Sequence, residues 1–600
     1  MCGIAGMMMR DGATPPPALL DRMRAALAHR GPDGDAVSIV GDVGLVHTRL
    51  AIIDLATGDQ PLLDDHGGAL VANAEIYNYL ELRAEMGEAL FSTRSDCEPP
   101  LRLYRVAGVG FADRLRGMYA IAIHDQAERK LVLSRDPFGI KPLYYAETET
   151  CLAFASEPQA IVAAGLVPPA VRADRRAELL ELQFTTGAET IFEGIRRVLP
   201  GETLVVAGGR IIERHRRAAL PDGGPRAVEA ADALKQLDAA LADSVDVHRR
   251  ADVPYGMFLS GGIDSTAVLA MMARLDDRPV LAFTAGFDDA SVADERAEAR
   301  RVARALGARH VEVGFGADDF WNLLPRVAAA MDDPAADYAT LPTYKLAAVA
   351  AAEVKVVLTG EGGDELFGGY GRYRAAIRPW WRGGKGFRAR GILDGLGLLR
   401  HDEPAWRDGI VASEHLATRG GRSRLQVVQA VDCADWLPND LLTKLDRCLM
   451  AHGLEGRTPF LDPAVAAVAF TLPDALKVRD RTGKWLLRQW LADNVPAAEP
   501  FAHKRGFSVP VASWIAAAGD KLGPLVAAQP GVAELCDPLA VRRLFVSHAR
   551  HAGMAQWVLL FYALWHRRHV LGLMPDGDVM HCLAASRDTP GLTASVRASG

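Results

Sequence analysis

The sequence predicts a multidomain α/β protein, and three observations support this fold class. The chain has 600 residues, whereas a single hydrophobic core seldom grows beyond ~300 residues. Short β-branched and aromatic runs separated by Gly, Pro and Asp fill the first ~200 residues, which is typical of sheets with few helices. Strands then alternate with helices, which indicates a largely parallel sheet covered on both faces.

The first part of the chain is expected to form one domain over residues 1–215. It contains predicted strands at 44–53, 117–125 and 130–134, and predicted helices at 19–27 and 77–86. A stretch rich in Pro and Gly at 218–226 (AALPDGGPR) then marks a linker. We place this linker at residues 216–228.

The second domain is expected to span residues 229–574. Leucines at 234, 237 and 241, followed by Val245, predict an amphipathic helix. Predicted strands follow at 253–259, 280–287, 310–313 and 355–358, with a helix at 266–275. The chain after residue 405 is mostly helical in pattern. Residues 378–400 show no periodicity and suggest a surface insertion, and residues 575–600 suggest a flexible tail.

Composition excludes several classes of protein. Hydrophobic residues make up 49% of the chain, and 68 Lys and Arg against 75 Asp and Glu give a net charge of −7. No overall basic field attracts nucleic acid or an acidic membrane surface, and no stretch approaches the ~20 apolar residues that span a bilayer. The seven cysteines are scattered without a C-x-x-C pair. We therefore expect a cytoplasmic enzyme with neither a nucleic-acid nor a membrane partner.

Cys2 is the first candidate catalytic residue. Removal of Met1 would leave a residue that carries both a thiol and a free α-amine. With pKa values of about 8.5 for the thiol and about 7.7–8.0 for the amine, the amine can act as the base for its own side chain. Such a nucleophile needs no histidine partner.

Five further motifs occur in order behind Cys2. They are 29–34 (HRGPDG), 47–54 (HTRLAIID), 73–78 (NAEIYN), 95–98 (SDCE) and 135–144 (RDPFGIKPLY). Together with Cys2 they resemble the class-II, N-terminal nucleophile (Ntn) glutamine amidotransferases. The resemblance implies a four-layer α+β Ntn-hydrolase sandwich in which Cys2 attacks the amide of glutamine.

The resemblance also implies a role for each polar residue of these motifs. Arg49 would pair with the glutamine carboxylate, and Glu75 and Asp96 would hold its ammonium and amide. The Asn73 side chain and the main-chain N–H of Ala74 would form the oxyanion hole. Ala74 stands where the family has glycine, so the backbone is strained if its φ is positive. Ile52 and Ile53 complete the implied glutamine-binding set.

A second constellation begins at 260–265 (SGGIDS), between a predicted strand and a predicted helix. Glycines at such a turn let backbone N–H groups and the helix N-terminus surround an anion. No G-x-x-x-x-G-K-[ST] motif is present. The run resembles the PP-loop of ATP pyrophosphatases. Three carboxylates follow a later strand in a glycine-rich turn at 358–370, where they suit Mg²⁺ beside a triphosphate.

The two constellations in one chain resemble glutamine-hydrolysing asparagine synthetase over residues ~1–570. The resemblance implies a PP-loop (adenine nucleotide α-hydrolase-like) second domain that amidates aspartate through β-aspartyl-AMP, with glutamine, aspartate and ATP as substrates and Mg²⁺ as cofactor. The implied adenosine contacts are Phe258, Ala285, Thr359 and Gly360. The implied pyrophosphate contacts are Ser260, Gly261, Gly262, Asp264 and Ser265. Mg²⁺ would be held by Asp264 and Asp364. Glu361 would promote either formation of the acyl-adenylate or the attack of ammonia, and Lys484 would stabilise the pentavalent phosphorus.

Two departures leave the acceptor acid open. Gly456 stands where the family has a larger aliphatic residue, and 502–504 (AHK) replaces a more basic Arg-x-Lys arrangement. An amidotransferase of the same architecture that acts on another carboxylate, such as a cell-surface sugar or peptide, is the alternative. Cys2 and Arg49 argue against a ring-closing relative, and family precedent suggests a homodimer.

Overall fold

The first half of the chain contains two six-stranded antiparallel sheets. The computed structural model describes residues 2–287, 294–379, 381, 384–401, 404–502, 509–549 and 551–585. The first sheet has the order β10 (Arg196–Arg197), β8 (Tyr144–Glu147), β9 (Cys151–Ala155), β1 (Gly3–Met9), β3 (Val43–Arg49), β2 (Gly34–Val40). The second has the order β12 (Arg210–Arg216), β11 (Glu202–Ala207), β7 (Lys130–Arg135), β6 (Gly117–Asp125), β5 (Gly68–Ile76), β4 (Leu62–Leu63).

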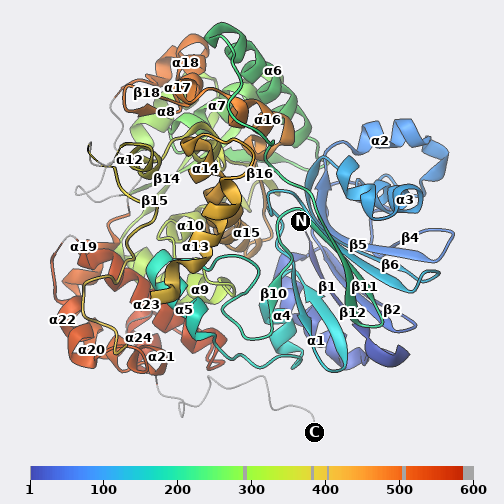
Figure 1. The fold of residues 1–600 in the computed structure, drawn as a ribbon, viewed down its shortest axis with the longest axis horizontal. Helices are drawn as coiled ribbons and strands as arrows, with labels where there is room; N and C mark the ends of the chain where they lie inside the picture. The colour runs from blue at the N-terminus through green and yellow to red at the C-terminus, as the bar shows by residue number, and fades with distance from the viewer. Residues whose placement is uncertain are drawn as a thin grey trace.

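These sheets pack face to face and are covered by helices on both outer sides (Figure 1). Ile4 of β1, Leu45 of β3 and Val71 of β5 meet in the core between the sheets. Helices α1 (Pro17–Leu27) and α4 (Pro158–Ala163) cover the first sheet, and α2 (Tyr79–Met86) and α3 (Glu98–Ala107) cover the second. The predicted four-layer sandwich is therefore confirmed. The predicted strand 44–53 ends at Arg49 and continues as a loop.

The second half contains a five-stranded parallel sheet. Its order is β15 (Arg309–Phe315), β14 (Leu281–Phe287), β13 (Tyr255–Phe258), β16 (Val356–Leu358), β17 (Glu455–Arg457). One face carries α6 (Ala230–His248), α7 (Ile263–Leu275), α8 (Arg296–Ala305) and α18 (Trp485–Asn494), and the other carries α9 (Ala317–Ala330), α10 (Thr340–Ala350) and α15 (Leu442–Met450). The predicted parallel sheet covered on both faces is confirmed. In such sheets ligands bind at the carboxyl ends of the strands, where the strand order reverses.

Strand β17 was not predicted, because its three residues lie in a stretch whose pattern is helical. A Cβ atom built on Gly456 would lie 3.0 Å from Leu449 Cδ2 and 3.1 Å from Leu445 Cγ, both on α15. Close packing of α15 on β17 thus explains why glycine stands at this position. The remaining predicted strands and the long helix α6 are confirmed within a few residues of their expected bounds.

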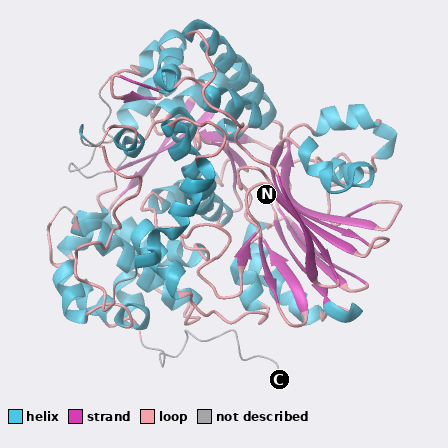
Figure 2. Ribbon diagram, in the orientation of Figure 1, coloured by secondary structure: helices cyan, strands magenta, loops and turns pink. Residues whose placement is uncertain are grey.

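Helices dominate the chain after residue 405, as predicted (Figure 2). They include α13 (Asp408–Ala417), α14 (Arg424–Val431), a π-helix η7 (Asp432–Leu441), α16 (Pro463–Thr471) and α23 (Ala552–His569). Within the expected insertion at 378–400, Arg388 Nη2 lies 3.0 Å from Asp432 Oδ1, and this ion pair links the stretch to η7. None of the helices within the described ranges combines the length and the apolar character needed to cross a membrane.

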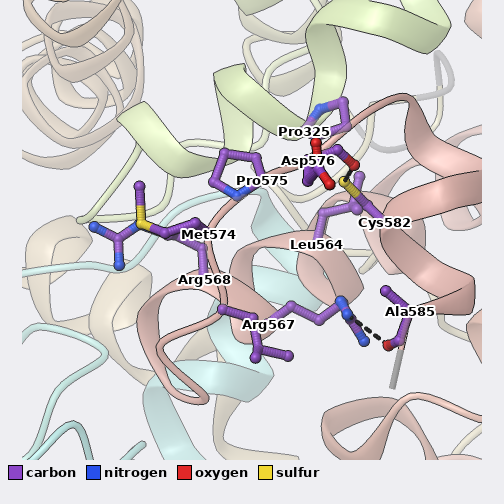
Figure 3. Close-up of a pocket in the computed structure, with 10 residues that line it drawn as sticks. Pro325, Leu564, Arg567, Arg568, Met574, Pro575, Asp576, Cys582 and Ala585 are labelled. Atoms are coloured by element: carbon purple, nitrogen blue, oxygen red, sulfur yellow. Dashed lines mark hydrogen bonds between the residues drawn. The ribbon is translucent and has the colours of Figure 1, made fainter. Parts of the chain in front are cut away.

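The expected flexible tail is wrong for residues 575–585. Helix α24 (Val579–Ala584) buries Val579 and Leu583 against the neighbouring helices. Arg567 Nη2 donates to the Ala585 carbonyl at 2.9 Å beside a small pocket that Leu564 and Cys582 also line (Figure 3). Residues 586–600 lie outside the described part of the chain. The domain boundaries at 215, 229 and 574 stay predictions.

Candidate functional site

Strand β5 presents a row of main-chain N–H groups at the edge that faces away from β6. Ala72 N–H donates to Gln60 Oε1 at 2.6 Å, and Ile76 N–H donates to Asp96 Oδ2 at 2.8 Å. Since alternate N–H groups of a strand point to the same side, the Ala74 N–H between them faces this edge as well. Ala74 is not among the residues with positive φ. Alanine therefore replaces the family's glycine here without backbone strain.

Cys2 lies directly beside this strand. Its main-chain N–H donates to Asn73 Oδ1 at 3.1 Å, and its thiol is 4.0 Å from the Leu50 carbonyl. Burial raises the pKa of the Cys2 thiol, so the thiol needs a base to become a thiolate. Asn73 Nδ2 is buried and has no hydrogen-bond partner among the described residues. An amide donor and a main-chain donor thus lie next to the sulfur-bearing residue, as an oxyanion hole requires.

The predicted glutamine-carboxylate ligand ends β3. Arg49 Nη1 lies 2.8 Å from Asp59 Oδ1, and Arg49 Nη2 donates to the Asp54 carbonyl at 2.5 Å. The Asp59 side chain is 82% exposed, so a substrate carboxylate can take its place on the guanidinium. Ile52, which is buried, and Ile53 follow in the same loop.

Glu75 shares a face of β5 with Asn73, because side chains two residues apart on a strand point to the same side. Burial raises the pKa of Glu75 well above its usual range, while the charge of Arg457 opposes this. Burial also raises the pKa of Asp96 to about 6. Arg457 Nη2 lies 2.8 Å from Glu75 Oε2. Sequence analysis missed Arg457, whose contact with Glu75 joins the two halves of the chain.

The serine–glycine loop connects β13 to the N-terminus of α7. Ser260 Oγ lies 3.1 Å from Ser265 Oγ and accepts from the Gly262 N–H at 3.2 Å. Gly261 has φ +68°, a conformation that favours glycine. Hydroxyls, backbone donors and the positive end of α7 therefore surround a space suited to an anion.

The predicted adenosine contacts lie in or directly after three adjacent strands. Phe258 ends β13, Ala285 lies in β14, and Thr359 and Gly360 follow β16. A Cβ atom on Gly360 would lie 2.8 Å from the Ser265 nitrogen. The glycine thus lets the two loops pack against each other at the carboxyl edge of the sheet.

Lys484 bridges the two predicted metal ligands. Its ammonium pairs with Asp264 and lies 2.5 Å from Asp364 Oδ1. Burial alone would lower the pKa of Lys484, but the two carboxylates raise it above its usual range. The described residues contain no group of three or more His, Cys, Asp or Glu that would hold a metal by itself. Two carboxylates completed by phosphate oxygens fit Mg²⁺, which seldom takes an all-protein cage.

Glu361 has neighbours that sequence analysis did not single out. Lys444 Nζ lies 3.8 Å from Glu361 Oε1 and 2.9 Å from Asp337 Oδ2. Asp440, four residues before Lys444 and at the end of η7, is fully buried. Neither of its carboxylate oxygens has a hydrogen-bond partner among the described residues. A π-helix often marks a functional site, but the sequence of η7 shows only a helical pattern.

The departure noted at 502–504 cannot be placed in the fold. Residues 503–508, which include His503 and Lys504, lie outside the described part of the chain. The departure noted at 502–504 therefore stays a sequence observation.

The fold and the two sets of side chains define a class of protein: a nucleophile-bearing amidohydrolase sandwich joined to a nucleotide-binding parallel sheet. Comparison with family models agrees, since residues 1–216 match the glutamine amidotransferase domain and residues 236–567 match asparagine synthase. The chain belongs to the asparagine synthase family of glutamine-dependent amidotransferases.

Individual relatives cover most of the chain. A Mycobacterium tuberculosis (strain H37Rv) protein, provisionally named a glutamine-hydrolysing asparagine synthetase, is 35% identical over 94% of this chain and 97% of its own length. Asparagine synthetase (glutamine-hydrolysing) 1 of Bacillus subtilis (strain 168) is 33% identical over 86% of this chain and 88% of its own. Among solved structures, an allosteric regulatory enzyme of purine biosynthesis matches with 15% identity and a TM-score of 0.29, covering 52% of this chain and 80% of that chain.

Proposed function

We propose that this protein converts aspartate to asparagine with ATP and glutamine, through a β-aspartyl-AMP intermediate, and releases AMP, pyrophosphate and glutamate. The observation that carries the proposal is the presence of two complete chemical sets in one chain. One set surrounds Cys2 beside β5, and the other surrounds Lys484 at the carboxyl edge of the parallel sheet.

In the first half-reaction the Cys2 sulfur attacks the side-chain amide of glutamine. Its own α-amine, freed by removal of Met1, takes the thiol proton. Asn73 Nδ2 and the Ala74 N–H donate to the oxyanion, whose charge develops only in the transition state. Arg49 holds the substrate carboxylate and Glu75 its ammonium, with Asp96 beside it. Ammonia leaves, and water hydrolyses the thioester to glutamate.

In the second half-reaction a carboxylate of aspartate attacks the α-phosphorus of ATP. The carboxylate oxygen forms the new bond to phosphorus, and pyrophosphate leaves from the opposite side. Residues 260–265 hold the pyrophosphate, and Lys484 stabilises the negative charge that develops on it. When bound, Mg²⁺ would be held by Asp264 and Asp364 and would neutralise phosphate charge. Ammonia then displaces AMP, and Glu361 is placed to take its proton.

The surroundings of Glu361 favour an amino acid as the acceptor. A buried carboxylate without a partner is costly, and burial raises the pKa of Asp440 well above its usual range. Asp440 lies one helical turn from Lys444, so both side chains lie on one face of the helix. An ammonium group would satisfy Asp440, and a carboxylate would suit Lys444. Aspartate carries both groups.

The proposal is tested with purified protein, MgATP, glutamine and aspartate. We expect AMP, pyrophosphate, glutamate and asparagine in equal amounts. Formation of ADP and phosphate would contradict the mechanism, and turnover with another acid but not aspartate would contradict the acceptor. In Cys2→Ala, glutamine-driven synthesis should vanish while ammonium-driven synthesis persists.

We also propose a cytoplasmic location, because all seven cysteines are free, as is usual in a reducing compartment. The homodimer stays a prediction.

A further inference from the structure

Arg457 contacts both halves of the chain at once. Through its main chain it belongs to β17, where its carbonyl accepts from the Thr359 N–H at 2.8 Å. Through its side chain it reaches Glu75 of β5, with Nη2 2.8 Å from Oε2. A residue of the nucleotide-binding sheet therefore supplies the counter-charge of a predicted glutamine ligand. Figure 1 shows the N-terminus where β5 and the parallel sheet approach each other.

The orientation of this guanidinium is fixed on every side. Arg457 is fully buried. Its Nε lies 2.6 Å from Glu455 Oε1, and its Nη1 donates to the carbonyls of His248 at 2.8 Å and Arg250 at 2.7 Å. A planar guanidinium held by three anchors cannot rotate without breaking them. Nη2 is consequently directed at Glu75.

The charge of Arg457 opposes the effect of burial on the pKa of Glu75. Burial raises the pKa of Glu75, and the nearby carboxylates of Glu455 and Asp96 raise it further. Among these influences Arg457 is the one that lowers the pKa most. Without Arg457 the buried Glu75 carboxyl group would lose the guanidinium that lies beside it, and its ionised form, which an ammonium needs as a partner, would be less favourable.

We propose that Arg457 is a positioning residue for glutamine: its anchored guanidinium holds the Glu75 side chain in place, so that the glutamine site is complete only when the synthetase half is docked. The inference rests on the proposed function in one respect, because it takes Glu75 as the ligand of the glutamine ammonium. It adds that a residue outside the amidotransferase half governs recognition of the nitrogen donor.

The test compares Arg457→Gln with the full-length parent. Glutamate release from glutamine alone is measured without ATP or acceptor, so the result does not depend on which acid is amidated. Loss of a buried charged contact predicts a rise in the KM for glutamine of about 10- to 100-fold. We expect kcat to change far less, and ammonium-driven AMP formation to stay within about twofold of the parent.

Arg116→Gln is the matched control. Arg116 also joins the two halves, with Nε 2.7 Å from Asp462 Oδ2, but it contacts none of the predicted substrate ligands. Its KM for glutamine should equal that of the parent. Arg457→Lys, which keeps the charge but loses the planar fork, should give an intermediate KM and serves if Arg457→Gln does not fold.

Three results would overturn the inference. They are a parental KM for glutamine in both Arg457 variants, an equal rise in the Arg116→Gln control, and an equal loss of the glutamine-driven and ammonium-driven reactions. The pH profile gives a further readout, because the acid limb of glutamine use should move to higher pH in Arg457→Gln as Glu75 retains its proton. Failure of the proposed synthetase reaction would show instead as absent AMP formation with ammonium, which leaves the glutaminase comparison intact.

Discussion

Substitution of Asn73 separates the two tasks that the structure gives to this one amide. Its Oδ1 accepts from the Cys2 N–H at 3.1 Å, and its Nδ2 is buried with no partner among the described residues. Asn73→Ala removes both the acceptor and the donor. Asn73→Asp keeps an acceptor for Cys2 but replaces the donor with an oxygen.

The expected magnitude follows from these two contacts. Loss of one oxyanion donor costs about 10²- to 10³-fold in kcat, or ~2.7–4 kcal/mol. Loss of a neutral hydrogen bond adds ~0.5–1.5 kcal/mol. We therefore expect glutaminase kcat to fall about 10³-fold in Asn73→Ala. It should fall at least as far in Asn73→Asp, because a carboxylate would repel the oxyanion.

The assay follows glutamate release and, separately, ammonium-driven AMP formation, which should not change. Asn78→Asp is the control: Asn78 lies at the same end of β5, but its amide donates to the Arg114 carbonyl at 2.9 Å and takes no part in the site. A glutaminase rate in Asn73→Ala within about threefold of the parent would refute the oxyanion assignment, as would an equal loss with ammonium.

Three further predictions concern the second half. Asp440→Asn should raise the KM for aspartate at least about tenfold in the ammonium-driven assay, because an ammonium loses its charged partner; an unchanged KM would contradict the acceptor subsite. Gly360→Ala, whose Cβ would lie 2.8 Å from the Ser265 nitrogen, should raise the KM for ATP without affecting glutaminase kinetics, and an effect on both would count against separate sites. Burial lowers the pKa of Lys477 to about 7, against ~10.4 when unfolded. The unfolded chain then binds more protons above pH 7, so stability should rise toward pH 10 by up to ~1.4 kcal/mol per pH unit. Lys477→Met should lose this slope in Tm, and an unaltered slope would disprove the assignment.

The loops that carry the nucleotide chemistry are visible in the sequence because their signals are local. Glycine and serine at 260–265 follow a run of β-forming residues and precede a helix, so the turn and its donors can be predicted together. The same holds for Thr359 and Gly360 after β16. That these two turns lie at the same edge follows from the parallel sheet that the strand–helix alternation predicts. The place of Lys484 between Asp264 and Asp364 does not follow from it, because Lys484 lies outside this sheet.

Arg457 and Asp440 could not be found in this way. A strand of three residues, such as β17, is too short to show alternation, and the partner of Arg457 lies in the other half of the chain. The sequence around Asp440 and Lys444 indicates only a helix. Lys444 is paired with Asp337, whereas Asp440 has no partner among the described residues. This difference depends on the elements that pack around the helix. Such residues are recognised from the buried partners that a charge has or lacks, which only a three-dimensional structure reveals.

The buried contacts between the halves bear on how the two proposed half-reactions could be coupled in one chain. The Cys2 carbonyl accepts from Arg30 Nε at 3.2 Å. The same guanidinium donates to the Asp446 carboxylate of α15, from Nη1 at 2.7 Å and from Nη2 at 2.9 Å. Lys444, next to Glu361, lies on that same helix. Breaking one partner of a buried ion pair typically costs ~3–5 kcal/mol, so the nucleophile and the acceptor helix are held at a fixed separation. Ammonia in water is mostly protonated and cannot attack an acyl-adenylate, so the proposed mechanism requires its path to be shielded from water. In that mechanism the ion pairs that join the halves would serve the transfer of nitrogen as well as the stability of the fold.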